Sequence, residues 1–254
     1  MRSKEDVALV LSLIGEGLNH CEISRRTGIP RPTVRDWASG KIPRHATERH
    51  ARHGCAVCGH DRHDPASLPR EEYVYLLGVY LGDGCISALA KGIYALRLFQ
   101  DMRYPRIISE WSAAVRAVMP RNRVYVLYNV GGGKCAEVKS LSKSWPCLFP
   151  QHGPGRKHER AIALAGWQQM LVEEDPRPLI RGLIHSDGCR VINKSMGHEY
   201  LRYMFVNASA DIRGIFTDAC DQLGIPWRRS APRTISVSRR EGIEILDSFV
   251  GPKS

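Results

Sequence analysis

One ten-residue segment occurs twice in this 254-residue chain, and it limits the possible folds more than any other feature. The copies are LLGVYLGDGC at residues 76–85 and IRGLIHSDGC at residues 180–189. Apolar residues at i, i+3 and i+4 before each aspartate predict a helix, and the glycine that follows is the residue type that ends helices in a left-handed turn. We therefore expect Asp83 and Asp187 each to end a helix.

A carboxylate at a helix C-terminus faces the negative end of the helix dipole, at a cost of a few tenths to about 1 kcal/mol. In both copies a glycine, Gly78 or Gly182, stands five residues before the aspartate. If these glycines let the two helices cross closely, both carboxylates emerge at one end of the pair, where divalent cations could neutralise them and hold a phosphate. The alternative is that Asp-Gly is only a common turn dipeptide. Its repetition on two apolar helices favours the metal site.

Residues 77–84 and 181–188 resemble the two signature helices of a single-chain LAGLIDADG (dodecapeptide-type) homing endonuclease. The last acidic residue of each motif is the metal ligand in that family, so the resemblance implies that Asp83 and Asp187 are catalytic and bind Mg²⁺. The chain departs from the family pattern at the earlier acidic position, where Leu81 and His185 stand. The resemblance therefore supports the catalytic aspartates better than it supports DNA cleavage.

The repeat extends beyond the motifs. An extended apolar-aromatic run follows each motif at residues 94–99 and 200–205, and a helix follows each run, near residues 106–111 and 211–216. Further strands are predicted at 124–128, 136–141 and 234–238, with closing helices near Trp145 and Ile243. The pattern predicts an α+β protein with two pseudo-symmetric αββαββα repeats. The resemblance covers about residues 70–250 and implies two antiparallel sheets that form a saddle over a duplex.

The N-terminal residues predict a small all-α domain. Residues 7–18 and 21–28 have helical patterns, and a third helix starts near Pro32 and stops at Gly40, as in a helix-turn-helix. The start of the third helix would enter the major groove. The candidate DNA contacts are Arg31, Thr33, Arg35 and Asp36. A helical bundle without a DNA role is the alternative, which the clustered arginines disfavour.

Residues 43–68 are rich in Arg, His, Pro and Gly and have little apolar periodicity, which is typical of a linker. A Cys-x2-Cys pair, Cys55 and Cys58, is followed by His60 and His63, and these four side chains could form a tetrahedral zinc site. The close second pair does not fit an ordinary zinc finger, so both Zn²⁺ binding and ordinary linker residues remain open.

The predicted organisation has five parts. They are a helix-turn-helix domain at 1–45, a linker at 46–68, repeats at 69–150 and 175–254, and a basic connector at 151–174. We expect the connector either to lie along a phosphate backbone or to act as a flexible joint, and to include a helix over 161–172.

The charge of the chain indicates an acidic partner. Lys and Arg number 37 against 26 Asp and Glu, which leaves a net charge of +11, and double-stranded DNA is the leading candidate. Each of these residues could instead be an ordinary solvated charge. The candidate contacts on or beside the strands are Arg97, Lys134, Lys139, Arg202, Arg228, Arg229 and Arg233, and Lys139, Lys143 or Arg239 could lie near the scissile phosphates.

We therefore expect a sequence-specific DNA-binding protein, acting as a monomer through its repeat. The enzymatic hypothesis is Mg²⁺-dependent phosphodiester hydrolysis by Asp83 and Asp187. The alternatives are a transcriptional regulator that uses the fold only to bind DNA, and an RNA-binding module. No apolar run of about 18 residues is present to cross a membrane, and the charged N-terminus does not resemble a secretory signal, which predicts a cytoplasmic protein.

If zinc is bound, it should be lost from a Cys55→Ser, Cys58→Ser double variant, because thiolates supply most of the softness that selects this metal. Elemental analysis of protein purified without chelator tests this prediction. Zinc retained by the double variant would contradict it, and zinc-free wild-type protein would mean that both cysteines are ordinary linker residues.

Overall fold

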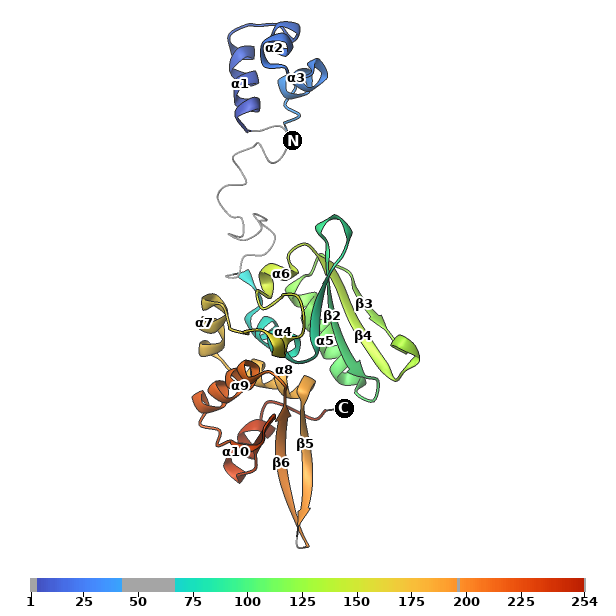
Figure 1. The fold of residues 1–254 in the computed structure, drawn as a ribbon, viewed down its shortest axis with the longest axis vertical. Helices are drawn as coiled ribbons and strands as arrows, with labels where there is room; N and C mark the ends of the chain where they lie inside the picture. The colour runs from blue at the N-terminus through green and yellow to red at the C-terminus, as the bar shows by residue number, and fades with distance from the viewer. Residues whose placement is uncertain (1–3, 43–66, 196, 254) are drawn as a thin grey trace. The chain divides into compact units, whose positions relative to one another are not determined.

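The computed structural model describes residues 4–42, 67–195 and 197–253. Contacts divide the chain into two compact units, Met1–Asp64 and Pro65–Ser254, which are described separately (Figure 1). The predicted zinc residues Cys55, Cys58, His60 and His63 lie outside the described residues.

The first unit contains three helices. They are α1 (Lys4–Gly15), α2 (His20–Thr27) and α3 (Arg31–Ala38). Asn19 caps α2 by accepting hydrogen bonds from the backbone N–H groups of Cys21 and Glu22, both at 3.0 Å, and the Glu22 carboxylate accepts from the Asn19 N–H in return. Gly28 ends α2 in the left-handed conformation with φ 67°, and Trp37 of α3 is buried in the core of the unit.

The second unit contains the predicted pair of repeats. The first repeat consists of α4 (Arg70–Asp83), β1 (Gly84–Ala88), β2 (Tyr94–Asp101), α5 (Pro105–Val118), β3 (Val124–Leu127), β4 (Cys135–Ser142) and α6 (Trp145–Leu148). The second consists of α8 (Arg177–Asp187), β5 (Gly188–Ser195), β6 (His198–Val206), α9 (Ala210–Gln222), β7 (Arg228–Ala231), β8 (Thr234–Val237) and α10 (Arg240–Asp247). The sheets are antiparallel, with orders β1-β2-β4-β3 and β5-β6-β8-β7. The predicted α+β class and the αββαββα order are confirmed.

Helices α4 and α8 pack against each other between the two sheets (Figure 1). Their backbones meet at the predicted glycines. A Cβ atom on Gly182 would lie 2.9 Å from the Val79 nitrogen and still closer to the Tyr75 carbonyl oxygen, and one on Gly78 would lie 3.0 Å from the Leu183 nitrogen. Every residue of α4 from Tyr73 to Leu81 is buried, so this helix is the centre of the core.

The glycines after the aspartates serve a different purpose from the one expected. Gly84 has φ −88° and Gly188 has φ −109°, so both are extended, and the predicted left-handed turns are wrong. A Cβ atom on Gly84 would lie 2.6 Å from the Tyr80 Cα, and one on Gly188 would lie 2.7 Å from the Ile184 Cα. Each strand leaves its helix so tightly that only glycine fits the available space.

The connector after α6 packs onto α4 and is not a free joint. It includes a turn of 3-10 helix (Lys157–Glu159) and helix α7 (Gly166–Glu174). The Gln168 amide donates to the Tyr73 hydroxyl at 2.7 Å, and the centroids of the Phe149 and Tyr80 rings are 4.4 Å apart. These contacts bring a basic segment to the end of α4.

Replacing Gly182 with alanine should destabilise the protein by at least about 3 kcal/mol, because the added methyl group meets rigid backbone on α4. Gly214→Ala is the matched control, since this helical glycine of α9 has no neighbouring atom within 4 Å of the added Cβ. The control should stabilise by about 0.5–1 kcal/mol through helix propensity. Denaturant unfolding of both variants measures the difference, and equal stabilities would contradict the close crossing.

Candidate functional site

The two predicted aspartates lie together at one end of the helix pair. Asp83 and Asp187 are the last residues of α4 and α8, and a Cβ atom on Gly82 would lie 3.2 Å from the Asp187 Oδ2. Burial, together with the neighbouring Asp187 charge, raises the pKa of Asp83 to about 6 against the opposing effect of Lys253 and Lys157. Burial also raises the pKa of Asp187, opposed by a hydrogen bond of 2.6 Å from the Asn207 amide.

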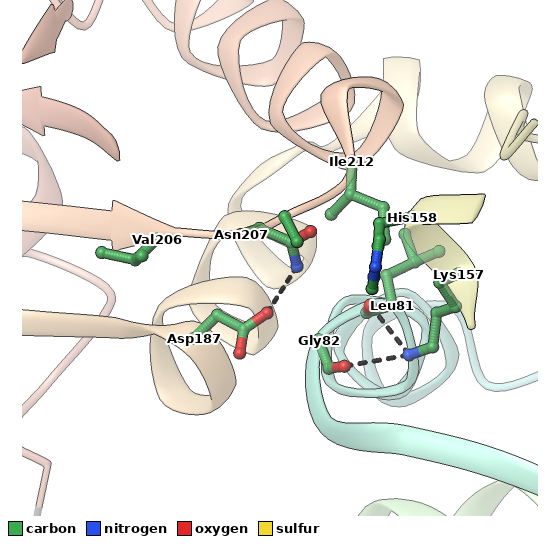
Figure 2. Close-up of a pocket in the computed structure, with 9 residues that line it drawn as sticks. Leu81, Gly82, Lys157, His158, Asp187, Val206, Asn207 and Ile212 are labelled. Atoms are coloured by element: carbon green, nitrogen blue, oxygen red, sulfur yellow. Dashed lines mark hydrogen bonds between the residues drawn. The ribbon is translucent and has the colours of Figure 1, made fainter. Parts of the chain in front are cut away.

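Two lysines that were not predicted as site residues cap the same helix ends. The Lys157 Nζ donates to the carbonyl oxygens of Leu81 and Gly82, both at 2.9 Å (Figure 2). It also donates to the carbonyl oxygen of Tyr80. The last carbonyls of a helix lack partners within the helix and form the negative end of its dipole. A buried ammonium group there compensates the unfavourable position of the Asp83 carboxylate.

Helix α8 is capped in the same way by the C-terminal segment. The Lys253 Nζ donates to the carbonyl oxygens of Ser186 and Gly188, both at 3.1 Å. Burial lowers the pKa of Lys253, and the charges of Asp83, Cys189 and Asp187 oppose this shift. Burial lowers the pKa of Lys157 to about 8, again opposed by the two aspartates. Two carboxylates and two ammonium groups thus form one charge cluster.

This arrangement does not fit a divalent cation held by the protein. Mg²⁺ and Ca²⁺ need several oxygen ligands, and the carbonyl oxygens nearest the aspartates already accept hydrogen bonds from lysines. Two positive charges also balance the two negative ones. No group of three or more His, Cys, Asp or Glu residues that could hold a metal occurs among the described residues.

A small pocket of about 250 Å³ opens beside Asp187. Figure 2 shows that it lies between the ends of α4 and α8 and the start of α9, with residues of the connector opposite Asn207. Its polar lining is supplied by Lys157, His158, Asp187 and Asn207. The pocket could accept a small anionic or polar group.

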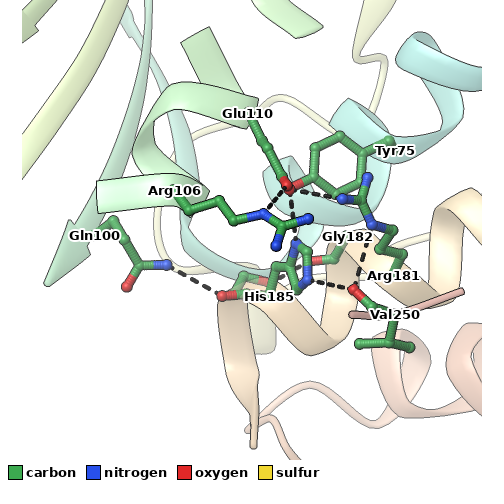
Figure 3. Close-up of polar contacts among 9 residues, drawn as sticks. Tyr75, Gln100, Arg106, Glu110, Arg181, Gly182, His185 and Val250 are labelled. Carbon is green, nitrogen blue, oxygen red and sulfur yellow. Dashed lines mark hydrogen bonds and ion pairs between the residues drawn. The ribbon is translucent and has the colours of Figure 1, made fainter. Parts of the chain in front are cut away.

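His185, which stands where the resembled family has an acidic residue, has a structural role. Its ring is buried, with Nδ1 2.8 Å from the Tyr75 hydroxyl and Nε2 2.9 Å from the Val250 carbonyl oxygen (Figure 3). A carbonyl only accepts, so Nε2 carries the proton and Nδ1 accepts from Tyr75. Burial and the Arg181 charge lower the pKa of His185 to about 4, so the ring is neutral near pH 7.

Glu110 of α5 contacts both motif helices beside His185. It accepts hydrogen bonds from Arg106 at 3.1 Å and from Arg181 at 2.7 Å, and it lies 3.5 Å from the Tyr75 hydroxyl, whose proton goes to His185 (Figure 3). The Gln100 amide donates to the His185 carbonyl oxygen at 3.1 Å. This network fixes α4, α5, α8 and β2 relative to one another.

The first sheet presents basic and aromatic side chains on the face opposite its buried leucines. Arg97, Lys139 and Tyr125 are direct cross-strand partners and therefore share a face, whereas Leu96 and Leu98 of β2 are buried on the other. The Arg97 guanidinium pairs with Glu137 through bonds of 2.6 and 3.2 Å. Lys139 is the better placed of the two for an external phosphate.

The predicted cations of the second repeat separate into two groups. Arg202 and Arg228 share the open face of the sheet, because Arg202 lies two residues from Met204 and Arg228 pairs with Ser236, the partner of Met204. The Arg202 Nε is buried without a hydrogen-bond partner. Arg229 points to the other face and donates to the Pro232 carbonyl oxygen at 2.6 Å.

The remaining candidates lie apart from the helix ends. Lys134 and Arg233 are exposed in turns, and Lys143 and Arg239 are exposed just beyond β4 and β8. On α3, Arg31 and Arg35 are exposed while Thr33 and Asp36 are half-buried. No helix of the described residues is long and apolar enough to span a membrane.

Ionised Asp83 should destabilise the fold, because its pKa is raised from 3.8 to about 6 on folding. The folded state then binds more protons than the unfolded state between these pH values, so the stability contributed by Asp83 falls as the pH rises from about 4 to 6. Asp83→Asn should remove this dependence and stabilise the protein at pH 7 by up to about 3 kcal/mol. Unfolding measured for both proteins from pH 4 to 7 in chelator tests this, and parallel profiles would contradict it.

No protein-family model and no curated protein matches this sequence. Among solved structures, a mesophilic variant of the homing endonuclease I-DmoI is similar over 72% of this chain and 91% of its own, with 15% identity and a TM-score of 0.48. The LAGLIDADG meganuclease I-AabMI, bound to uncleaved DNA, is similar over 70% and 82%, with 11% identity and a TM-score of 0.43. The N-terminal LAGLIDADG domain of DUF199/WhiA is similar over 74% and 88%, with 13% identity and a TM-score of 0.40. The unit Pro65–Ser254 has the two-repeat LAGLIDADG fold. Its element order, its two equivalent sheets and the close crossing of its motif helices at glycines establish this.

Proposed function

We propose that this chain is a sequence-specific double-stranded DNA-binding protein. The observation that carries the proposal is the pair of equivalent antiparallel sheets, each with an open face that presents basic side chains beside aromatic or apolar ones. Antiparallel ribbons can enter the major groove and read base edges. The net charge of +11 supplies the attraction for phosphates.

Each sheet offers a small set of side chains for contact with DNA. In the first sheet we assign this role to Lys139 and Tyr125, with Lys134 in the adjoining turn. In the second we assign it to Arg202 and Arg228. The buried, unpartnered Nε of Arg202 supports the assignment, because a buried donor without an acceptor is costly and a phosphate or base edge would supply one.

The helices of the first unit add a second DNA-binding element. Arg31 and Arg35 are exposed on α3, the third helix of the predicted helix-turn-helix, and Trp37 holds this helix to its core. We propose that α3 contacts DNA and that one chain binds one duplex, because the two repeats supply both halves of a pseudo-twofold site. The contacts divide the chain into two compact units, which is consistent with separate binding modules.

A Mg²⁺-dependent phosphodiesterase is the second candidate. The convergence of Asp83 and Asp187 at one end of the helix pair favours it, and the resident lysines disfavour it. Incubating the full chain with a library of duplexes in Mg²⁺ or Mn²⁺ separates the candidates. Cleavage abolished by Asp187→Asn would establish the enzyme, and selective binding without cleavage would establish the non-cleaving regulator.

Lys139→Ala and Arg202→Ala should each weaken duplex binding and reduce the slope of log K against log salt by about 1, the loss of one phosphate contact. Arg116→Ala is the matched control, because Arg116 is exposed on α5 and away from both open sheet faces. The control should leave affinity and slope unchanged. Binding measured over a salt series tests this, and equal effects of all three changes would reject the sheets as the DNA-binding surface.

Deleting residues 1–45 should weaken duplex binding while leaving the thermal transition of the remaining chain cooperative, because the two units have separate hydrophobic cores. Calorimetry of the truncated chain, with a binding assay, tests both parts. Loss of the transition would show that the N-terminal helices complete the main core.

A further inference from the structure

We propose that the ammonium groups of Lys157 and Lys253 are built into the motif-helix ends and occupy the place of divalent metal ions. This inference concerns the site at Asp83 and Asp187, and only its consequence for DNA rests on the proposed function. It explains how two buried carboxylates can end two helices whose negative dipole ends lie at the same place.

The hydrogen bonds of Lys157 account for its entire ammonium group. A lysine ammonium has three N–H donors, and Lys157 meets three carbonyl oxygens, those of Tyr80, Leu81 and Gly82. A divalent cation beside Asp83 would have to displace this group to use the Gly82 carbonyl as a ligand. Lys157 is therefore built into the fold, and it keeps no donor for an external phosphate.

Lys253 differs in one respect. It donates to two carbonyl oxygens, those of Ser186 and Gly188, so one of its three N–H donors is left over from these bonds. The same ammonium lies 5.3 Å from the centre of the Tyr104 ring, and the Lys157 ammonium lies 4.9 Å from that of Tyr80. Each cation thus also rests against an aromatic face, which favours a retained positive charge.

The arrangement follows the pseudo-symmetry of the repeats. Lys157 comes from the segment after α6, and Lys253 comes from the segment after α10, the closing helix of the second repeat. Each segment returns to the motif helix of its own repeat. Its lysine donates to the carbonyl oxygen of the residue before the aspartate, Gly82 or Ser186, and Lys253 also donates to that of Gly188, the residue after it. A Gly-Pro pair precedes each lysine, Gly153-Pro154 and Gly251-Pro252, so the two segments match in local sequence as well as in position, which indicates a shared function.

The electrostatic consequence is a neutral cluster. A divalent ion near the aspartates would be attracted by two carboxylates and repelled by two ammonium groups, so the net attraction that concentrates Mg²⁺ at acidic sites is lost. We infer that the protein binds duplex DNA without divalent ions and that the helix ends hold the saddle together and do not cleave.

The test uses the full chain and Mn²⁺ as the probe. Calorimetric titration of wild-type protein should show no saturable Mn²⁺ binding at millimolar concentrations. The Lys157→Met, Lys253→Met double variant should gain saturable binding, at least on the order of tenfold tighter, because two carboxylates lose their counter-charges. Asp83→Asn and Asp187→Asn in the same background should abolish the gain.

Lys194→Met is the matched control, because its side chain is 76% exposed on the second sheet, and it should behave as wild type. Saturable Mn²⁺ binding by wild type that Asp83→Asn and Asp187→Asn remove would overturn the proposal. A folded double variant that gains no binding would overturn it too. If the double variant does not fold, the wild-type titration decides alone.

Duplex binding in chelator and in Mg²⁺ is measured in parallel. Equal affinities in the two buffers are the expected result, and an affinity that requires Mg²⁺ would overturn the inference. Absence of duplex binding in both buffers would reject the proposed function and leave the Mn²⁺ titration as a separate test of the lysines.

Discussion

The architecture of the second unit depends on the close approach of two helix backbones at Gly78 and Gly182. Because no side chain separates them there, α4 and α8 bring their C-termini to one place and hold the two sheets in equivalent positions. That approach creates an electrostatic problem, since two carboxylates and two negative helix ends then meet in a partly buried site. Lys157 and Lys253 place positive charges at these two helix ends and so offset the repulsion.

Hydrogen bonds and charge balance at the helix ends decide the role that we propose for the two aspartates. Asp83 and Asp187 end the two paired helices, and Lys157 and Lys253 donate to the adjacent carbonyl oxygens and balance the charge. His185 likewise joins a buried network with Tyr75 and Val250. The helix ends are therefore fixed by hydrogen bonds, and under the proposed function the open sheet faces contact DNA.

Much of the fold could be predicted from the sequence, because the repeated motif and the strand patterns are local signals. The crossing glycines were predicted correctly, but Gly84 and Gly188 were expected to be left-handed, since their steric role depends on how tightly each strand leaves its helix. Lys157 was missed because a single lysine in a basic, glycine-rich connector has no pattern that points to a distant helix end. The Gly-Pro pair that precedes each lysine after the closing helix of its repeat, Gly153-Pro154 and Gly251-Pro252, could have indicated the two lysines together.

A crystal of the full chain bound to duplex and soaked in Mn²⁺ tests the account most directly, because anomalous scattering locates manganese and the electron density locates the lysines. The account predicts no manganese peak between Asp83 and Asp187, and ammonium groups within hydrogen-bond distance of the Gly82 and Ser186 carbonyl oxygens. A manganese ion coordinated by both aspartates, with the lysines displaced toward the DNA, would contradict it.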